Sequence, residues 1–286
     1  MMVRTTLHAT LLLLLLIGCS PTSKTRSADP ALQQLREEQR LLAIYSTNPL
    51  PRMETLEQRR IETPHGQMTL QCYAPGGRDL PVILLLPSID FQSGDVVTHD
   101  RIARTLAIDT PAVVILPTLP QTPEATLQTS IEVAAAALDW MTARVDRLGG
   151  ATNCLTIVGE GAAALHALRL AAMQRGHNDT ALRGLVLVTP VLRPYAMPAA
   201  NELNDLPEII ILSPTAGVDR DTAVALATAI DAAGTPHQMR VQPVDGALRL
   251  DWALASAEIY DTVLEVARLV RRLAAGCSGD QASETF

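Results

Sequence analysis

Short apolar runs rich in branched aliphatic residues alternate with longer segments whose apolar residues recur every three or four positions. The first pattern is typical of strands buried in a parallel sheet, and the second of helices that cover such a sheet. Strands are predicted at 58–62, 68–74, 82–86, 112–116, 155–158, 185–188, 209–212 and 238–241. Helices are predicted at 98–108, 123–145, 162–174, 219–233 and 252–274. This alternation predicts an α/β fold, with a mostly parallel central sheet of about eight strands and helices on both faces.

Turn and cap residues refine this outline. The first two strands flank Pro64-His65-Gly66, a turn sequence that predicts a hairpin. Pro123 is expected in the first turn of its helix, and Gly234 is expected just beyond the end of another. A further amphipathic helix is predicted at 32–45, before the first strand.

The N-terminal segment is interpreted as an export signal. Arg4 precedes a continuous apolar run at 11–17, and this run is too short to span a membrane comfortably. Leu16-Ile17-Gly18-Cys19 reads as a lipobox, which predicts that Cys19 is acylated and becomes the first mature residue. An ordinary cleaved signal peptide or an uncleaved anchor remains the alternative. With Ser20 next, we expect a lipid-anchored protein of the cell envelope, on the periplasmic face of the outer membrane.

The predicted layout therefore has one large domain with appendages. The segments are a lipoprotein signal peptide (1–18), a lipidated cysteine and polar tether (19–31), a helix and linker (32–54), the main domain (55–274) and a loose tail (275–286).

The composition of the chain limits the classes of partner and ligand that it is expected to bind. The formal net charge of -7 and an aromatic content of 3% argue against a nucleic-acid surface. Cys72 and Cys154 are expected about 14 Å apart, three strand spacings of about 4.8 Å, which excludes a disulfide between them. Cys277 can reach either, but free thiols are expected. No Cys/His spacing indicates zinc, and no metal or cofactor is predicted.

The turn between the strand at 155–158 and the following helix contains Gly159, Glu160 and Gly161. Gly159, Gly161 and Ala164 also fit a dinucleotide-binding pattern. That pattern belongs on the first strand of a sheet, whereas several strands precede this one, and Glu160 would repel a pyrophosphate. Close packing of the helix against the sheet explains the small residues better.

Residues 82–100 read VILLLPSIDFQSGDVVTHD. This segment is similar to the oxyanion loop of hormone-sensitive-lipase-like esterases in the α/β-hydrolase superfamily, where a strand leads into His-Gly-Gly-Gly-Phe, then Gly-Asp and Thr-His-Asp. The residues in register are Phe91, Gly94, Asp95, Thr98, His99 and Asp100. Trp140 matches a helix tryptophan, and residues 159–163 match the Gly-Asp-Ser-Ala-Gly elbow. The resemblance covers roughly 57–274 and implies an α/β-hydrolase fold. The chain is also similar to uncharacterised proteobacterial exported α/β-hydrolase-like proteins with a Gly-x-Gly elbow.

The chain departs from this family at the positions that carry catalysis. The resemblance places the nucleophile at Gly161 and the oxyanion loop at Pro87-Ser88-Ile89-Asp90. The acid falls near Gly217, although two aspartates follow closely, and the histidine falls within 243–248. A serine hydrolase needs a nucleophile, a base, an orienting acid and oxyanion donors. No histidine follows His237, so we predict no catalytic residues in the family positions.

The sheet order of the superfamily would bring Asp90 and Glu160 to the same edge, where they can share a proton or hold a cation. Ser88 would then be a displaced nucleophile. Solvated carboxylates are the alternative. No histidine is expected at the sheet edge that holds Asp90 and Glu160. His99 is expected to cap or pack in its own helix, and His166 is expected to be a packed or surface residue.

We therefore expect a non-catalytic lipoprotein whose remaining crevice binds a small apolar or acyl ligand, or whose surface binds an envelope protein. The expected binding residues are Ser88, Asp90, Glu160, Gly161 and Ala162. Two alternatives remain: an ester or amide hydrolase with a rearranged site at Ser88, Asp90 and Glu160, and a structural envelope protein with a vestigial pocket.

Overall fold

A computed structural model describes residues 30, 31, 33, 34, 37, 49–88, 96–120, 125–176, 182–192, 195–243, 250, 257–275 and 277. The few described residues between 30 and 37 are helical, and the rest of the helix predicted at 32–45 lies outside the described residues. So do residues 1–29, with the predicted signal peptide, Cys19 and most of the tether. None of the helices in these ranges is long and apolar enough to cross a membrane.

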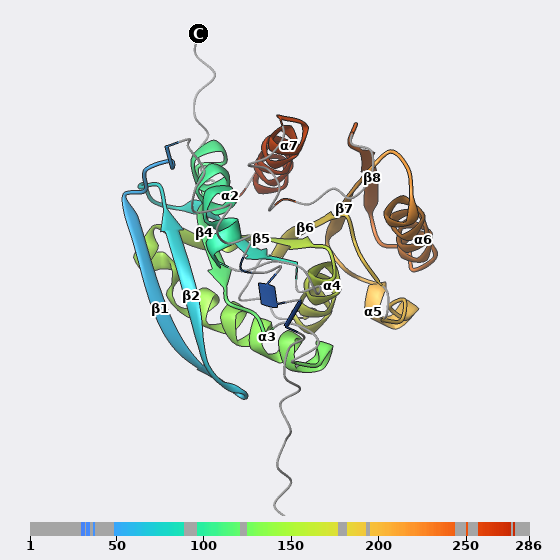
Figure 1. Cartoon of the computed structure of the whole chain (residues 1–286), viewed down its shortest axis with the longest axis horizontal. Coiled ribbons are helices and arrows are strands. Elements are labelled where there is room, and N and C mark those ends of the chain that lie inside the picture. Colours follow the sequence, from blue (N-terminus) through green and yellow to red (C-terminus); the bar gives the residue numbers. More distant parts are fainter. Residues whose placement is uncertain are drawn as a thin grey trace, which may run out of the picture.

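An eight-stranded sheet forms the centre of the molecule (Figure 1). Its strands are β1 (Thr55–Thr63), β2 (Gly66–Ala74), β3 (Leu80–Leu86), β4 (Val113–Pro117), β5 (Gly150–Glu160), β6 (Leu182–Val188), β7 (Glu208–Ser213) and β8 (His237–Val241). They lie in the order β1-β2-β4-β3-β5-β6-β7-β8. β1 pairs with β2, and β2 with β4, in antiparallel register, whereas the other pairs are parallel. The predicted hairpin and the mostly parallel sheet are both confirmed.

Helices cover both faces of this sheet (Figure 1). They are α2 (Val96–Asp109), α3 (Leu127–Arg144), the short 3-10 helix η1 (Val145–Leu148), α4 (Ala163–Met173), α5 (Ala200–Leu203), α6 (Val218–Ala232) and α7 (Ala257–Ala274). α2 and α7 share one apolar core with the sheet, while α3, α4 and α6 share the other. β3 shows how a strand serves both cores: Leu84 packs on the α3/α4 side, and Ile83 and Leu85 pack on the α2/α7 side. Such two-sided burial explains its continuous apolar sequence.

Several predicted boundaries need correction. α3 begins at Leu127, and Thr126 caps it by accepting a hydrogen bond from the Thr129 N–H at 3.1 Å. Pro123, which was expected in the first turn, lies outside the described residues. β5 is longer than predicted, because polar residues at its start continue the strand beyond the apolar run. The short helix α5 was not predicted, since four residues carry too little periodicity.

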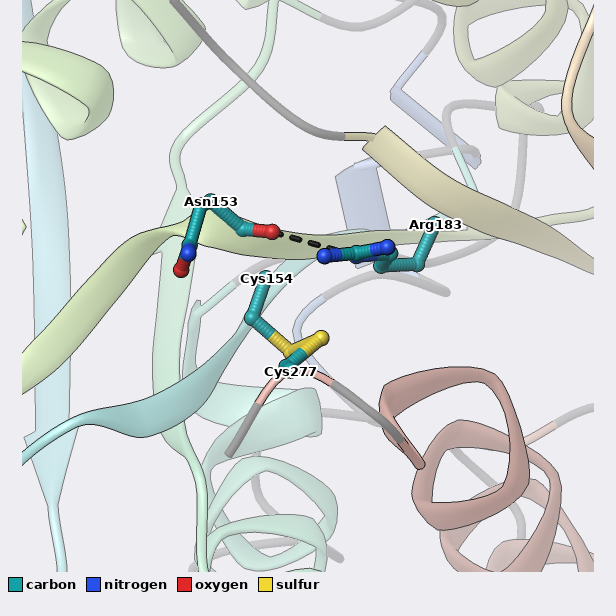
Figure 2. The surroundings of a disulfide bond; sticks show 4 residues. All are labelled: Asn153, Cys154, Arg183 and Cys277. Atoms are coloured by element: carbon teal, nitrogen blue, oxygen red, sulfur yellow. Dashed lines mark hydrogen bonds between the residues drawn. A yellow bond between two sulfur atoms is a disulfide. The ribbon is translucent and has the colours of Figure 1, made fainter. Parts of the chain in front are cut away.

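The C-terminal part of the chain is tied to the sheet by a disulfide between Cys154 in β5 and Cys277 after α7, with Cα atoms 5.5 Å apart. Figure 2 shows this bond beside Asn153, whose carbonyl accepts a hydrogen bond from Arg183 at 3.1 Å. The prediction of free thiols was therefore wrong for these two residues, because α7 returns the tail to β5. Cys72 is a buried free cysteine in β2. Burial raises the pKa of its thiol to about 12.

Candidate active site

The turn after β5 keeps the geometry of a nucleophile elbow. β5 ends at Glu160 and α4 begins at Ala163. Gly161 between them has a φ of 56°, a left-handed conformation that costs a residue with a side chain about 1–2 kcal/mol. Its N–H donates to the Val188 carbonyl at 2.9 Å, and its carbonyl accepts from the Val191 N–H at 3.0 Å. The backbone thus holds the sharp turn that a hydrolase uses to present its nucleophile, with glycine at the tip.

Gly159 serves the packing of α4. A Cβ atom added there would lie 2.7 Å from the Ala163 carbonyl oxygen and 3.0 Å from the Ala167 Cβ. Only glycine allows the first turn of α4 to approach β5 so closely. Gly159 at the elbow therefore has a packing role. The sequence favoured this explanation over dinucleotide binding.

Glu160 points to the opposite face of the sheet from Gly159, because side chains alternate along a strand. Its Oε2 lies 2.7 Å from Nε2 of His99 in α2, and both side chains are buried. Its Oε1 accepts a hydrogen bond from the backbone N–H of Leu250 at 2.6 Å. Glu160 therefore joins the elbow, α2 and the segment after β8 at one buried carboxylate.

The second ring nitrogen of His99 faces a hydroxyl. Its Nδ1 lies 3.0 Å from Oγ1 of Thr98, a buried residue in the first turn of α2. When the Glu160 carboxylate is ionised it can only accept hydrogen bonds, and in that state Nε2 would carry the proton toward Glu160 and Nδ1 would accept from the Thr98 hydroxyl. A hydroxyl, an imidazole and a carboxylate thus lie in one hydrogen-bonded chain. The sequence did not predict this chain of contacts, because His99 was expected to cap or pack within its own helix.

The predicted binding residues lie around the same rim, as far as they are described. Leu86 at the end of β3 pairs with Gly159, so Ser88, two residues further on, reaches the level of the elbow. Ser88 and Ala162 are both buried. Asp90 lies outside the described residues, so the predicted carboxylate pair with Glu160 is untested. Among the described residues, Glu160 contacts the His99 side chain and the Leu250 N–H.

The positions where the family carries its acid and histidine are also occupied differently. Gly217, with a φ of 91°, precedes α6, and Asp219 and Asp221 lie in the first turn of that helix. The segment 244–249 lies outside the described residues and contains no histidine. His237 begins β8 and therefore lies at the other end of the sheet.

His166 is buried in α4, one turn beyond the elbow. Neither ring nitrogen has a hydrogen-bond partner among the described residues. Burial, together with the charge of Arg169, lowers its pKa to about 4, an effect that the backbone of Ala162 partly offsets. This histidine is therefore neutral near pH 7. In the described ranges, no cluster of His, Cys, Asp or Glu side chains has the makings of a metal site.

These features define an α/β-hydrolase fold. A family model described as an alpha/beta hydrolase fold matches residues 90–195. The chain has this fold, and the predicted resemblance to esterases of the α/β-hydrolase superfamily is confirmed. No curated protein gives a significant match.

Particular esterase structures are similar over most of the chain. A thermophilic carboxylesterase cloned from a metagenomic library has 20% identity and a TM-score of 0.74, with 87% of this chain and 98% of that chain covered. A thermostable esterase from Pseudomonas putida has 19% identity and a TM-score of 0.74, covering 87% and 93%. A hyperthermophilic esterase from the archaeon Pyrobaculum calidifontis has 19% identity and a TM-score of 0.72, covering 85% and 93%. At these identities the likeness establishes the fold.

Proposed function

We propose that this protein hydrolyses small carboxylic esters through a rearranged site, with His99 as general base, Glu160 as the group that orients it, and a neighbouring hydroxyl as nucleophile. The esterase structures that share the fold support this assignment. The observation that carries it is the hydrogen-bonded chain from Glu160 through His99 to Thr98. An activated hydroxyl needs this arrangement of base and orienting acid.

In this proposal the Thr98 oxygen attacks the ester carbonyl while its proton passes to Nδ1 of His99. The proton then leaves with the alcohol, and a water molecule releases the acid from the acyl-enzyme by the same path. Glu160 keeps the imidazole in the tautomer that accepts at Nδ1. In the first turn of α4 the Ala164 and Leu165 N–H groups donate to the Gly161 and Ala162 carbonyls, so a developing oxyanion would be bound by the N–H groups of Ala162 and Ala163. Ser88, at the end of the adjacent strand, is the second candidate hydroxyl.

Short p-nitrophenyl esters test this proposal. We expect turnover by the wild type that is lost in Thr98→Val, which keeps the shape but removes the hydroxyl, and retained in Thr98→Ser. Thr105→Val is the matched control, because Thr105 is another buried threonine of α2. Mass spectrometry after treatment with a fluorophosphonate locates the nucleophile. An adduct on Ser88 would transfer that role to Ser88, and absence of turnover and adduct would refute hydrolysis.

Ligand binding without hydrolysis is the second candidate, favoured by the glycine at the tip of the elbow. Gly161 offers no side chain, and both oxygens of Glu160 already accept hydrogen bonds. In this case the crevice would hold a small apolar or acyl molecule, or the surface would bind an envelope protein. A copurifying ligand in native mass spectrometry, together with an inert wild type, would favour this candidate.

We further propose that Cys19 is lipidated and anchors the protein at the periplasmic face of the outer membrane. The apolar run and lipobox support this placement. The disulfide between Cys154 and Cys277 also supports it, because disulfides persist in oxidising compartments. Cys19→Ala is expected to move the protein from the membrane fraction to the soluble fraction. Continued membrane association would contradict the anchor.

A further inference from the structure

A cavity of about 840 Å³ lies at the amino ends of β3 and β5, where α7 ends. Its lining includes Arg78, Asp79, Asn153, Arg271 and Cys277. We call it the amino-edge basin. It lies at the opposite edge of the sheet from the elbow, because Glu160 ends β5 whereas Asn153 lies near its beginning. Figure 2 shows the Asn153 and Cys277 side of this region, with the disulfide to Cys154.

The backbone that carries Arg78 is fixed by close packing. The Leu80 N–H donates to the Gly149 carbonyl at 2.9 Å. Gly149 has a φ of 82°, and a Cβ atom there would lie 2.3 Å from the Gly77 carbonyl oxygen. Because the turn before β3 rests directly on the backbone of Gly149, the backbone position of Arg78 is set before any ligand arrives.

The opposite wall is fixed by independent contacts. The Arg271 guanidinium donates through Nη1 to the Asp109 carbonyl. Beyond it, the Cys277 N–H donates to the Ala274 carbonyl at 2.9 Å, and the disulfide holds Cys277 against β5. A cavity whose walls are fixed in this way loses little backbone entropy when a ligand binds.

The charges of the basin indicate its ligand. Arg78 and Arg271 contribute two positive charges against the single negative charge of Asp79, on a chain whose formal net charge is -7. In the described part of the chain, Arg78 forms neither a hydrogen bond nor an ion pair. Guanidinium groups bind the oxygens of planar carboxylates and tetrahedral phosphates through paired N–H donors. Asp79 favours a ligand with a hydroxyl beside its anionic group.

We propose that the amino-edge basin binds a small hydroxylated oxyanion, either a phosphate monoester or a carboxylate, through Arg78 and Arg271. This site is independent of the hydrolysis proposed at the elbow. Glycerol 1-phosphate and glycerate are matched probes, because they share hydroxyls on a three-carbon skeleton and differ in the anionic group.

Calorimetric titration of the full chain with each probe tests the proposal. We expect saturable binding of at least one probe, and the stronger probe identifies the anionic group. Arg78→Ala and Arg271→Ala should each weaken binding at least tenfold. Arg268→Ala is the matched control, because it removes a positive charge from α7 outside the basin and should change binding less than twofold.

Arg78→Gln and Arg271→Gln repeat the test with shorter, uncharged side chains that keep a hydrogen-bonding group, in case an alanine variant unfolds. They should show the same tenfold loss. The proposal is overturned if neither probe binds saturably to the wild type. It is also overturned if Arg268→Ala weakens binding as much as the basin variants do, since the binding would then reflect general charge.

Discussion

Nε2 of His99 and Oε2 of Glu160 lie 2.7 Å apart in the interior of the molecule, although the two residues are 61 positions apart in the chain. This contact links α2 to the end of β5. A buried carboxylate or imidazole that loses its hydrogen-bond partner cannot bind water in its place, so the free-energy cost of its desolvation is left uncompensated. The pair therefore supports the fold whether or not it also serves catalysis.

We predict that Glu160→Gln lowers the free energy of unfolding by about 1–3 kcal/mol, because the amide has one acceptor oxygen for the two buried donors, His99 Nε2–H and Leu250 N–H, and its NH2 group meets the other donor. The chain offers a matched control in His65 and Glu132, a second histidine–glutamate pair at 2.5 Å, in which both side chains are over one third exposed. Glu132→Gln should cause no measurable change. Urea unfolding checks both variants, and equal effects would contradict the importance of burial.

Because His166 is buried as a neutral imidazole, we predict that the free energy of unfolding falls in acid. Its pKa is lowered to about 4 in the folded protein and is about 6.5 when unfolded, so the unfolded chain binds the proton first. Stability conferred by the neutral imidazole is complete above pH 6.5 and is lost as the pH falls toward 4. From pH 7.5 to pH 5 this group should cost the wild type about 2 kcal/mol of unfolding free energy.

His166→Leu removes this group and should lack that part of the pH dependence. Urea unfolding of both proteins at pH 7.5 and pH 5 measures the difference. An unchanged difference between the two pH values would show that His166 titrates normally in the folded state.

We predict that the free energy of unfolding depends on whether the disulfide between Cys154 and Cys277 is formed. Opening the link between Cys154 and Cys277, which are 123 residues apart, should lower the free energy of unfolding by about 2–5 kcal/mol. Dithiothreitol should lower the Tm of the wild type and of Cys72→Ala, but not that of Cys277→Ser. A Tm of Cys277→Ser equal to that of the untreated wild type would contradict a stabilising link.

Gly161→Ser should add a hydroxyl without adding esterase activity, because no histidine follows β8 to take its proton. The left-handed backbone should make this variant about 1–2 kcal/mol less stable than the wild type. Gly161→Ala controls for the backbone effect alone. Ester hydrolysis above the wild-type rate by the serine variant would show that another base reaches the elbow.

The strands and their order followed from apolar runs and from the family resemblance, because two-sided burial leaves little choice of residue. The contact between His99 and Glu160 was missed for a physical reason. A helix face fixes which way a side chain points, but not which strand end it meets. One signal was present: His99 shares the apolar spacing of Ile102, Ala103 and Leu106, so it faces the core and needs a polar partner there.

The disulfide was missed for a related reason. The spacing of Cys154 from Cys72 could be argued from the order of strands, because both lie within the sheet. Cys277 lies beyond the last helix, and no sequence pattern fixes where such a segment returns. Its approach to β5 depends on how α7 packs, which is a tertiary property.

The hydrogen bond from the Leu250 N–H to Glu160 spans 90 residues of chain. During synthesis, the elbow therefore emerges before the group that completes it. Until residue 250 is available, the Glu160 carboxylate has no access to that donor, and the surrounding core cannot close around it without cost. The hydrogen bonds of Glu160 at the elbow are thus completed only when a segment from near the C-terminus has folded onto the sheet, even though the elbow lies in the middle of the sequence.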